Sequence, residues 1–247
     1  MRNKRAGFFT GFILLTALNG CSTTPVVDER DPFEAWNRKV YSVNEKLDDY
    51  AMKPVAKAYR WITPSFVDKA VTNVFSNIDD IGVTINSALQ GKFSQSGWDF
   101  SRFIVNSTVG VGGMIDVASM IELDKHDEDF GQTLGYWGVP TGPYIVLPLL
   151  GASSARGIFG LVGDAAMDPT SYFTFYIPGS TFYITASANA LKYTDIRADY
   201  LGTEAAAEEA SVFGKYEFYR NSYLSKRKAL VTDSVESDED DLLLNYE

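Results

Sequence analysis

The first part of the chain carries apolar residues with the period of an α-helix. Asp31 and Pro32 are an acid and a proline of the kind found at helix starts. Apolar residues then recur at spacings of three and four, which places them on one helical face. These residues are Phe33, Trp36, Val40, Val43 and Leu47. Pro54 predicts the start of a second, shorter helix, and Pro64 predicts its end near Thr63 because a proline disfavours helical backbone in the residue before it.

Two further helices are predicted before the chain changes character. A long helix is expected from Ser65 to about Leu89, and Gly91 follows it in the position where many helices end. Its apolar face consists of Phe66, Ala70, Val74, Ile78, Ile81, Ile85 and Leu89. The next helix is expected from Ser96 to about Val109.

The last part of the chain predicts two helices and a tail. Residues 181–193 predict a short helix, and a long charged helix follows after about Gly202. From residue 231 onward we expect a solvated, disordered tail, because the last fifteen residues contain seven acids and no base.

A segment with very few charges lies between these helices. Residues 130–191 contain only three charged side chains, Arg156, Asp164 and Asp168. The segment is interpretable as a buried core, as transmembrane helices, or as short re-entrant segments that dip into one membrane leaflet. Prolines and glycines interrupt each apolar run before it reaches the ~18–20 residues of a spanning helix. Core elements normally carry a polar outer face, which long stretches here lack, so we favour partial insertion.

Glycines recur every three residues in this segment, at Gly157, Gly160 and Gly163. On a helix they would form a strip of small residues that lets another helix approach closely. A non-helical loop is the alternative.

The N-terminus has the plan of a bacterial lipoprotein signal. Residues 1–20 are basic, then apolar, then small or polar, and the chain reads Leu-Asn-Gly-Cys up to Cys21. This resembles the lipobox, in which the cysteine receives N-acyl and S-diacylglycerol lipid. Residues 21–30 are then a lipidated tether. Ser22, in place of the aspartate typical of inner-membrane retention, indicates the periplasmic face of the outer membrane. An ordinary signal peptide with an incidental cysteine is the alternative.

The net charge of −10 limits the classes of partner. Nucleic acids bind mainly through Lys and Arg that neutralise phosphates, so we expect no nucleic-acid partner. Electrostatic docking on anionic lipid also needs basic clusters. A membrane protein with this charge must be held by apolar contacts or by a covalent lipid.

The chain offers few candidates for catalytic residues, and we expect no enzyme. His126 is the only histidine and lies among acids, where a solvated loop residue is favoured over a general base or a metal ligand. The single cysteine excludes a Cys-based zinc site. The sequence contains no Gly-x-Ser-x-Gly nucleophile elbow and no phosphate-binding loop. Apart from the lipid on Cys21, we expect no cofactor and no metal.

Several motifs occur in order over residues 31–230, and together they are specific. The strongest is 129–138 (DFGQTLGYWG). The others are 31–38 (DPFEAWNR), 53–56 (KPVA), 90–91 (QG), 102–103 (RF), Asn106, 110–118 (GVGGMIDVA), 142–144 (GPY) and 147–148 (LP). On these residues the chain resembles the VacJ/MlaA lipoproteins.

The resemblance implies an all-α fold, a single ring-like bundle of short helices with re-entrant apolar segments over residues 31–230, embedded in one leaflet. It implies a protein that removes mislocalised phospholipids from the outer leaflet through an amphipathic pore. The lipid would pass to a periplasmic carrier protein, which maintains lipid asymmetry, and the protein would associate with an outer-membrane porin trimer. The alternative is a porin-binding adaptor lipoprotein without transport activity.

Four residues are candidates for the lipid pathway. By the resemblance, Phe130 is an apolar gate element, with a core aromatic as the alternative. Asn37, Arg38 and Asp116 are polar groups in apolar surroundings, where burial is costly unless they are paired or hydrated. They predict pore or interhelical contacts, and for Arg38 and Asp116 a structural ion pair is the alternative.

Overall fold

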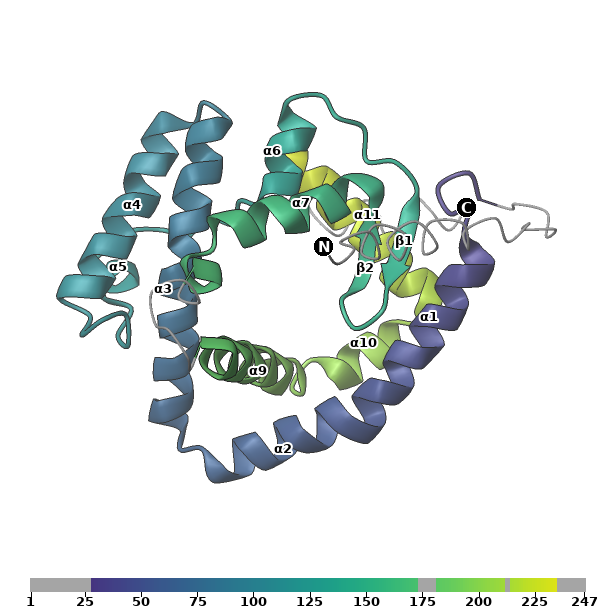
Figure 1. Ribbon diagram of the computed structural model, residues 1–247, viewed down its shortest axis with the longest axis horizontal. Coiled ribbons are helices and arrows are strands. Elements are labelled where there is room, and N and C mark those ends of the chain that lie inside the picture. Colours follow the sequence, from purple (N-terminus) through teal and green to yellow (C-terminus); the bar gives the residue numbers. More distant parts are fainter. Residues whose placement is uncertain (1–27, 173–180, 212–213, 235–247) are drawn as a thin grey trace, which may run out of the picture.

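The computed structural model describes residues 28–172, 181–211 and 214–234 (Figure 1). In this part of the chain the fold is almost entirely helical, and the helices follow one another around a ring. The all-α, ring-like bundle expected from the sequence is confirmed, with the addition of one short β-hairpin.

Several predicted segments lie outside the described residues. They are the signal peptide 1–20, the lipidation site Cys21, most of the tether 21–30 and most of the acidic tail 231–247. The described residues correspond to the predicted helical domain, with two short internal gaps.

The ring starts with one continuous helical stretch where the sequence predicted two helices. Helix α1 (Glu34–Leu47) passes through a π-helical turn, η2 (Asp48–Met52), into α2 (Lys53–Ile62). Pro54 lies in the first turn of α2. The predicted second helix is therefore present, with Pro54 in its first turn, but it continues from α1 without a break, because the wider π turn ahead of it accommodates a residue that cannot donate a backbone hydrogen bond. The helix ends before Thr63, as predicted.

The next two helices form a hairpin along one side of the ring (Figure 1). Helix α3 (Ser65–Leu89) has the predicted bounds, and Gly91 follows it with a positive φ of 76°. Helix α4 (Phe93–Thr108) begins three residues before the predicted start. A glycine-rich loop then returns the chain to the short helix α5 (Val117–Met120), which packs on α4.

The segment with few charges folds into two helices and the hairpin. Helix α6 (Phe130–Tyr136) precedes the antiparallel strands β1 (Tyr144–Leu147) and β2 (Gly151–Ser154), and α7 (Ala155–Met167) follows directly. The three glycines of the predicted small-residue strip are therefore helical. A Cβ built on Gly160 would lie 2.9 Å from a backbone atom of α6, so the strip does allow two helices to approach closely.

The chain closes the ring with three helices after a short 3₁₀ turn, η3 (Pro169–Tyr172). Helix α9 (Thr181–Tyr200) extends seven residues beyond the predicted end and packs on α2 and α3. The long charged helix expected after Gly202 is divided into α10 (Glu204–Ala210) and α11 (Lys215–Thr232). Helix α11 packs against α6 and β2, which brings the end of the domain back to its middle.

A helix that crosses a bilayer must be about 20 residues long and predominantly apolar. Within the described residues, no helix is both long enough and apolar enough to traverse a bilayer.

Candidate functional site

The interior of the domain is mainly polar. Among the described residues, eighteen polar or charged residues are buried and only eight apolar ones. In the described part of the chain, the apolar core cluster is small and contains Val40, Tyr144, Val146 and Tyr216, where α1, β1 and α11 meet. Burial of polar groups is costly unless they are hydrogen-bonded, so the interior must be held by a polar network.

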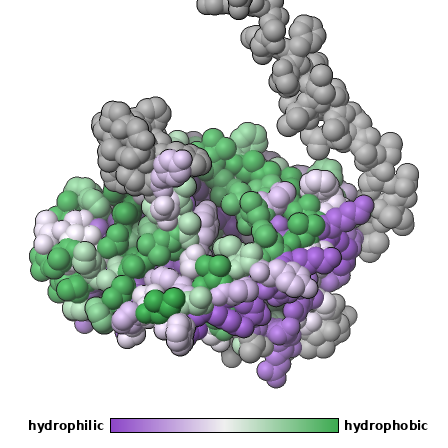
Figure 2. All heavy atoms as spheres, turned by 60° about the horizontal axis from the view of Figure 1, so that its bottom comes forward, coloured by the Kyte–Doolittle hydropathy of each residue, from purple (hydrophilic) through white to green (hydrophobic). Residues whose placement is uncertain are grey.

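Much of the exterior is correspondingly apolar. The exposed fraction reaches 86% for Trp61 and 75% for Leu149, and a long series of large apolar side chains accompanies them. Figure 2 shows hydrophobic residues over the side of the molecule that carries α4 and α5, and hydrophilic residues on the opposite side, near α1. Contiguous apolar surface of this extent marks a lipid or protein interaction site.

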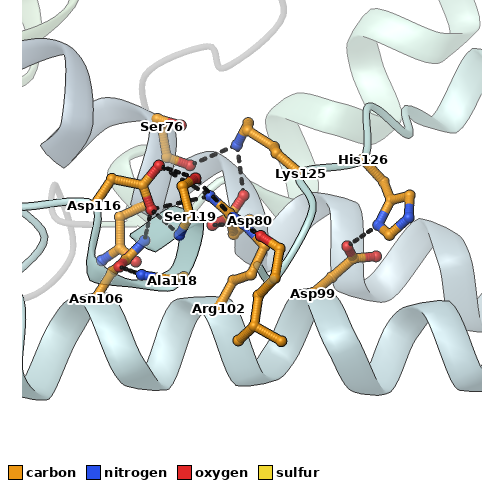
Figure 3. Close-up of polar contacts among 12 residues, drawn as sticks. Ser76, Asp80, Asp99, Arg102, Asn106, Asp116, Ala118, Ser119, Lys125 and His126 are labelled. Atoms are coloured by element: carbon orange, nitrogen blue, oxygen red, sulfur yellow. Dashed lines mark hydrogen bonds and ion pairs between the residues drawn. The ribbon is translucent and has the colours of Figure 1, made fainter. Parts of the chain in front are cut away.

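Arg102 is the centre of the polar network between α3, α4 and α5 (Figure 3). Its side chain is 1% exposed, and its Nη2 atom lies 3.2 Å from Oδ1 of Asp116. Its Nε atom lies 3.7 Å from Oδ2 of Asp80, on α3. Asp116 also caps α5 by accepting from the backbone N–H of Ser119 at 3.1 Å, and it accepts from the Asn106 amide at 3.0 Å. Burial raises the pKa of Asp116, but these hydrogen bonds outweigh burial and hold it at about 2.

The loop before α6 is attached to the same network. Lys125 donates to Oδ1 of Asp80 at 2.5 Å, and Nδ1 of His126 lies 2.7 Å from Oδ1 of the buried Asp99 (Figure 3). His126 is a loop residue, as expected, and its side chain is 36% exposed, but an acid on α4 supplies a partner that the local sequence does not reveal. No group of residues suited to hold a metal ion occurs in the described part of the chain.

Asn37 connects α1 to the hairpin. Its side-chain amide donates to the carbonyl oxygen of Tyr144 at 3.0 Å and accepts from the N–H of Val146 at 2.8 Å. Two turns along α1, Asn44 makes the same pair of contacts with the carbonyl of Leu147 and the N–H of Leu149, each at 2.9 Å. The two amides thus satisfy the free edge of β1, which would otherwise expose unpaired backbone groups.

Arg38 lies on the exposed side of α1. It donates to Glu34 at 2.7 Å, forms an ion pair with Glu217 on α11, and lies 4.3 Å from the ring centre of Tyr216. Arg38 and Asp116 thus both form ion pairs, but not with each other. Arg38 pairs with Glu217, and Asp116 pairs with Arg102.

Phe130 begins α6 and packs on α7. Its ring lies edge-on to Trp137, with 6.2 Å between the centroids, and a Cβ on Gly163 would lie 2.1 Å from it. The preceding residue, Asp129, caps α6 through the N–H of Gln132 at 2.8 Å. Arg227 of α11 donates to both carboxylate oxygens of Asp129.

A cavity of about 130 Å³ lies beside this ion pair, between β2, α6, α7 and α11. Asp164 on α7 lines it and accepts from the backbone N–H of Phe130 at 2.7 Å. Burial raises the pKa of Asp164 to about 6.

The structure brings together only some of the predicted site residues. Asn37 and Arg38 lie on α1, Asp116 lies in the α3–α4–α5 network, and Phe130 lies beside the cavity. Sequence reasoning did not propose Asp164 or Arg227 for the site. The signal for Asp164 was its isolation in a segment with only three charges.

Comparisons with known proteins agree with this architecture. The sequence model of the family "MlaA lipoprotein" matches residues 29–230. An intermembrane phospholipid transport system lipoprotein MlaA of Haemophilus influenzae is 30% identical over 97% of this chain and 98% of that protein. A protein of Rickettsia conorii is 37% identical over 63% of this chain, and the match spans 61% of the length of that relative.

The fold has a counterpart among solved structures. A structure described as the structural basis for maintenance of bacterial outer membrane lipid asymmetry superposes with a TM-score of 0.69 and 30% sequence identity. The match covers 81% of this chain and 98% of the solved one. The family match and the full-length relative lead to one conclusion: this chain belongs to the MlaA lipoprotein family.

Proposed function

We propose that this protein is the outer-membrane lipoprotein of a system that moves phospholipids between membranes. In this role it takes mislocalised phospholipids from the outer leaflet and passes them to a periplasmic carrier, which maintains outer-membrane lipid asymmetry. The names of the relatives in Haemophilus influenzae and Escherichia coli support the assignment to phospholipid transport.

The reversed polarity of the domain is the observation that carries this proposal. A domain with an extensive apolar outer face and a polar interior suits an environment of lipid tails outside and headgroups within. The ring of short helices fits a single leaflet better than a full bilayer. Guidance of a headgroup along a polar interior requires no covalent step, so the proposal assigns no catalytic residue.

The location and the partners belong to the same proposal. Lipid on Cys21 would hold the protein at the periplasmic face of the outer membrane, since two or more acyl chains anchor a protein stably. An outer-membrane porin trimer is the proposed membrane partner, and the exposed apolar side near α4 and α5 offers a surface for it.

A transfer assay tests the proposal. The purified full chain is placed in liposomes that contain fluorescent phospholipid, and transfer to a soluble lipid-binding acceptor is followed over time. We expect transfer above that of protein-free liposomes. Background transfer, together with co-purification of a porin, would favour the adaptor alternative and overturn the proposal.

A further inference from the structure

Arg156 is a buried cation that forms no ion pair with the described residues. It lies in the first turn of α7 and is only 6% exposed. Its Nη1 atom donates to the backbone carbonyl of Val139 at 3.0 Å, and no side chain in the described part of the chain hydrogen-bonds to its guanidinium. Burial of a charge is costly unless an opposite charge accompanies it, so this arginine needs an explanation.

The surroundings of Arg156 disfavour its charge further. It lies at the positive, N-terminal end of α7, which has no acid in its first turn. Burial lowers the pKa of Arg156, and the nearby Arg227 lowers it too. Tyr223 and Asp129 act in the opposite direction, but the net shift is downward. Asp129 is also already occupied, because Arg227 donates to both of its carboxylate oxygens.

The guanidinium of Arg156 lies beside an exposed, mainly apolar loop. Its Nη1 atom lies against α6 at Gly135, where an added Cβ would be 2.8 Å away. Residues 136–140 follow and are all exposed, among them Tyr136, Trp137 and Val139. None of the fully enclosed polar atoms without a partner belongs to Arg156, so its free N–H groups keep contact with solvent. A ligand that has an anionic group next to hydrocarbon fits this arrangement.

We infer that Arg156 binds the phosphate of a phospholipid, with the apolar side chains of residues 136–140 against the adjoining hydrocarbon. The inference rests on the proposed function and names one contact of the headgroup. Val139 occupies only Nη1, which leaves Nε and Nη2 of the planar guanidinium for phosphate oxygens. All glycerophospholipids carry this phosphate, so the contact favours phospholipids over uncharged lipids without selecting one headgroup.

The test compares a phospholipid with a lipid that lacks the phosphate. The full chain in detergent is incubated with equimolar dioleoylphosphatidylglycerol and dioleoylglycerol, then re-isolated, and its bound lipids are quantified by mass spectrometry. The variants are Arg156→Gln, which removes the charge and keeps a donor for Val139, and Arg156→Lys, which keeps the charge. Arg60→Gln, at an exposed position on α2, is the matched control.

For wild type and Arg60→Gln we expect enrichment of phosphatidylglycerol over dioleoylglycerol. Arg156→Gln should lower this ratio about tenfold, the effect of one charged hydrogen bond. Arg156→Lys should restore much of the preference. An unchanged ratio in Arg156→Gln, or no preference in wild type, overturns the inference and leaves the proposed function to its own transfer assay. Absence of bound lipid of either kind from every protein overturns both.

A second arm uses only the wild-type chain and therefore does not depend on the folding of a variant. It separates a lipid phosphate from a soluble one. Glycerol 3-phosphate is added to the same incubation in large molar excess. We expect the preference for phosphatidylglycerol to persist, because the soluble ester lacks the hydrocarbon that contacts residues 136–140. Loss of the preference would mean that Arg156 takes a soluble phosphate ester, which overturns the assignment to lipid.

Discussion

The side-chain amide of Asn37 is bonded to the backbone of Tyr144, a residue 107 positions away in the chain. The amide oxygen also accepts from the backbone N–H of Val146, so the side chain makes the two hydrogen bonds that a neighbouring strand would make along the edge of β1. Both partners are buried, with 0% exposure for Asn37 and 1% for Tyr144. This contact fixes the hairpin to α1 and closes the ring at that side.

Asn37→Ala should therefore destabilise the fold strongly. The substitution leaves a buried carbonyl and a buried N–H without partners, and each such loss costs about 1–3 kcal/mol. We expect the free energy of unfolding to fall by about 2–4 kcal/mol in urea titrations followed by circular dichroism. Asn189→Ala, at an exposed position on α9, serves as the control and should change it by less than about 0.5 kcal/mol. Equal effects of the two substitutions would contradict this role of Asn37.

Two glycine substitutions should have opposite effects. Gly160→Ala places a Cβ 2.9 Å from two backbone atoms of Gly131, and neither helix can move away without repacking. We expect a loss of about 1–3 kcal/mol in the free energy of unfolding. Gly97→Ala, in α4, meets nothing within 4 Å and should stabilise the protein by about 0.5–1 kcal/mol. Thermal unfolding of both variants measures the two signs, and stabilisation by Gly160→Ala would show that α6 and α7 do not pack through their glycines.

Asp164 should make stability depend on pH in the direction opposite to most acids. Its pKa in the folded protein is raised from 3.8 to about 6, because burial disfavours the charge. Its stabilising contribution is therefore full below pH 3.8 and is lost as the pH rises to about 6. A pKa shift of this size changes the free energy of unfolding by at most about 3 kcal/mol between the two pH limits.

Asp164→Asn removes that cost and should raise the free energy of unfolding at pH 7.5 by about 1–3 kcal/mol. The gain should vanish near pH 4, where the wild-type carboxyl is protonated. Urea titrations at the two pH values measure the difference. A destabilising effect at pH 7.5 would mean that the ionised carboxylate is well compensated within the protein.

Among the charged residues of the α3–α4–α5 network, Arg102 should cause the largest loss of folding stability when it is substituted. Arg102→Met leaves the buried Asp80 and the capping Asp116 without their common cation. Removal of one partner of a buried ion pair typically costs about 3–5 kcal/mol. Arg30→Met removes an exposed ion pair and should cost at most about 1 kcal/mol. Unfolding followed by intrinsic fluorescence distinguishes the two, and a similar small loss in both would exclude a central structural role for Arg102.

Substitution of an exposed apolar side chain should weaken membrane binding without affecting folding. Trp61→Glu replaces a ring that is 86% exposed on α2, so the folded structure should tolerate it. Binding of the chain to zwitterionic vesicles should weaken roughly tenfold, since the ring suits a membrane interface and a carboxylate does not. Lys57→Glu, also exposed on α2, should bind as wild type does. Unchanged vesicle binding by Trp61→Glu would place this face of α2 away from lipid.

The parts of the fold that depend on local spacing were predictable. The bounds of α3 followed from a regular apolar face and a terminal glycine, and the family followed from motifs in consecutive segments. The hairpin was missed, because its edge is satisfied by Asn37 and Asn44 on a helix far away in sequence. The partner of His126 on α4 was hidden for the same reason.

The site was less predictable than the fold. Asn37, Arg38, Asp116 and Phe130 stand out as residue types in their local segments, but the sequence does not say which helices face each other. Asp164 gains its significance from the cavity that it lines together with Gly131, Leu147 and Arg227. Those features come from four separate elements, so only the tertiary structure assembles them.

Outer-leaflet phospholipid in intact cells tests the central claim most directly. The gene is deleted in the source bacterium, and the deletion is complemented with wild type or with Cys21→Ala. We predict that phospholipid accumulates in the outer leaflet on deletion and returns to its low level only with the form that can be lipidated. An outer leaflet that stays unchanged after deletion would contradict phospholipid transport by this protein.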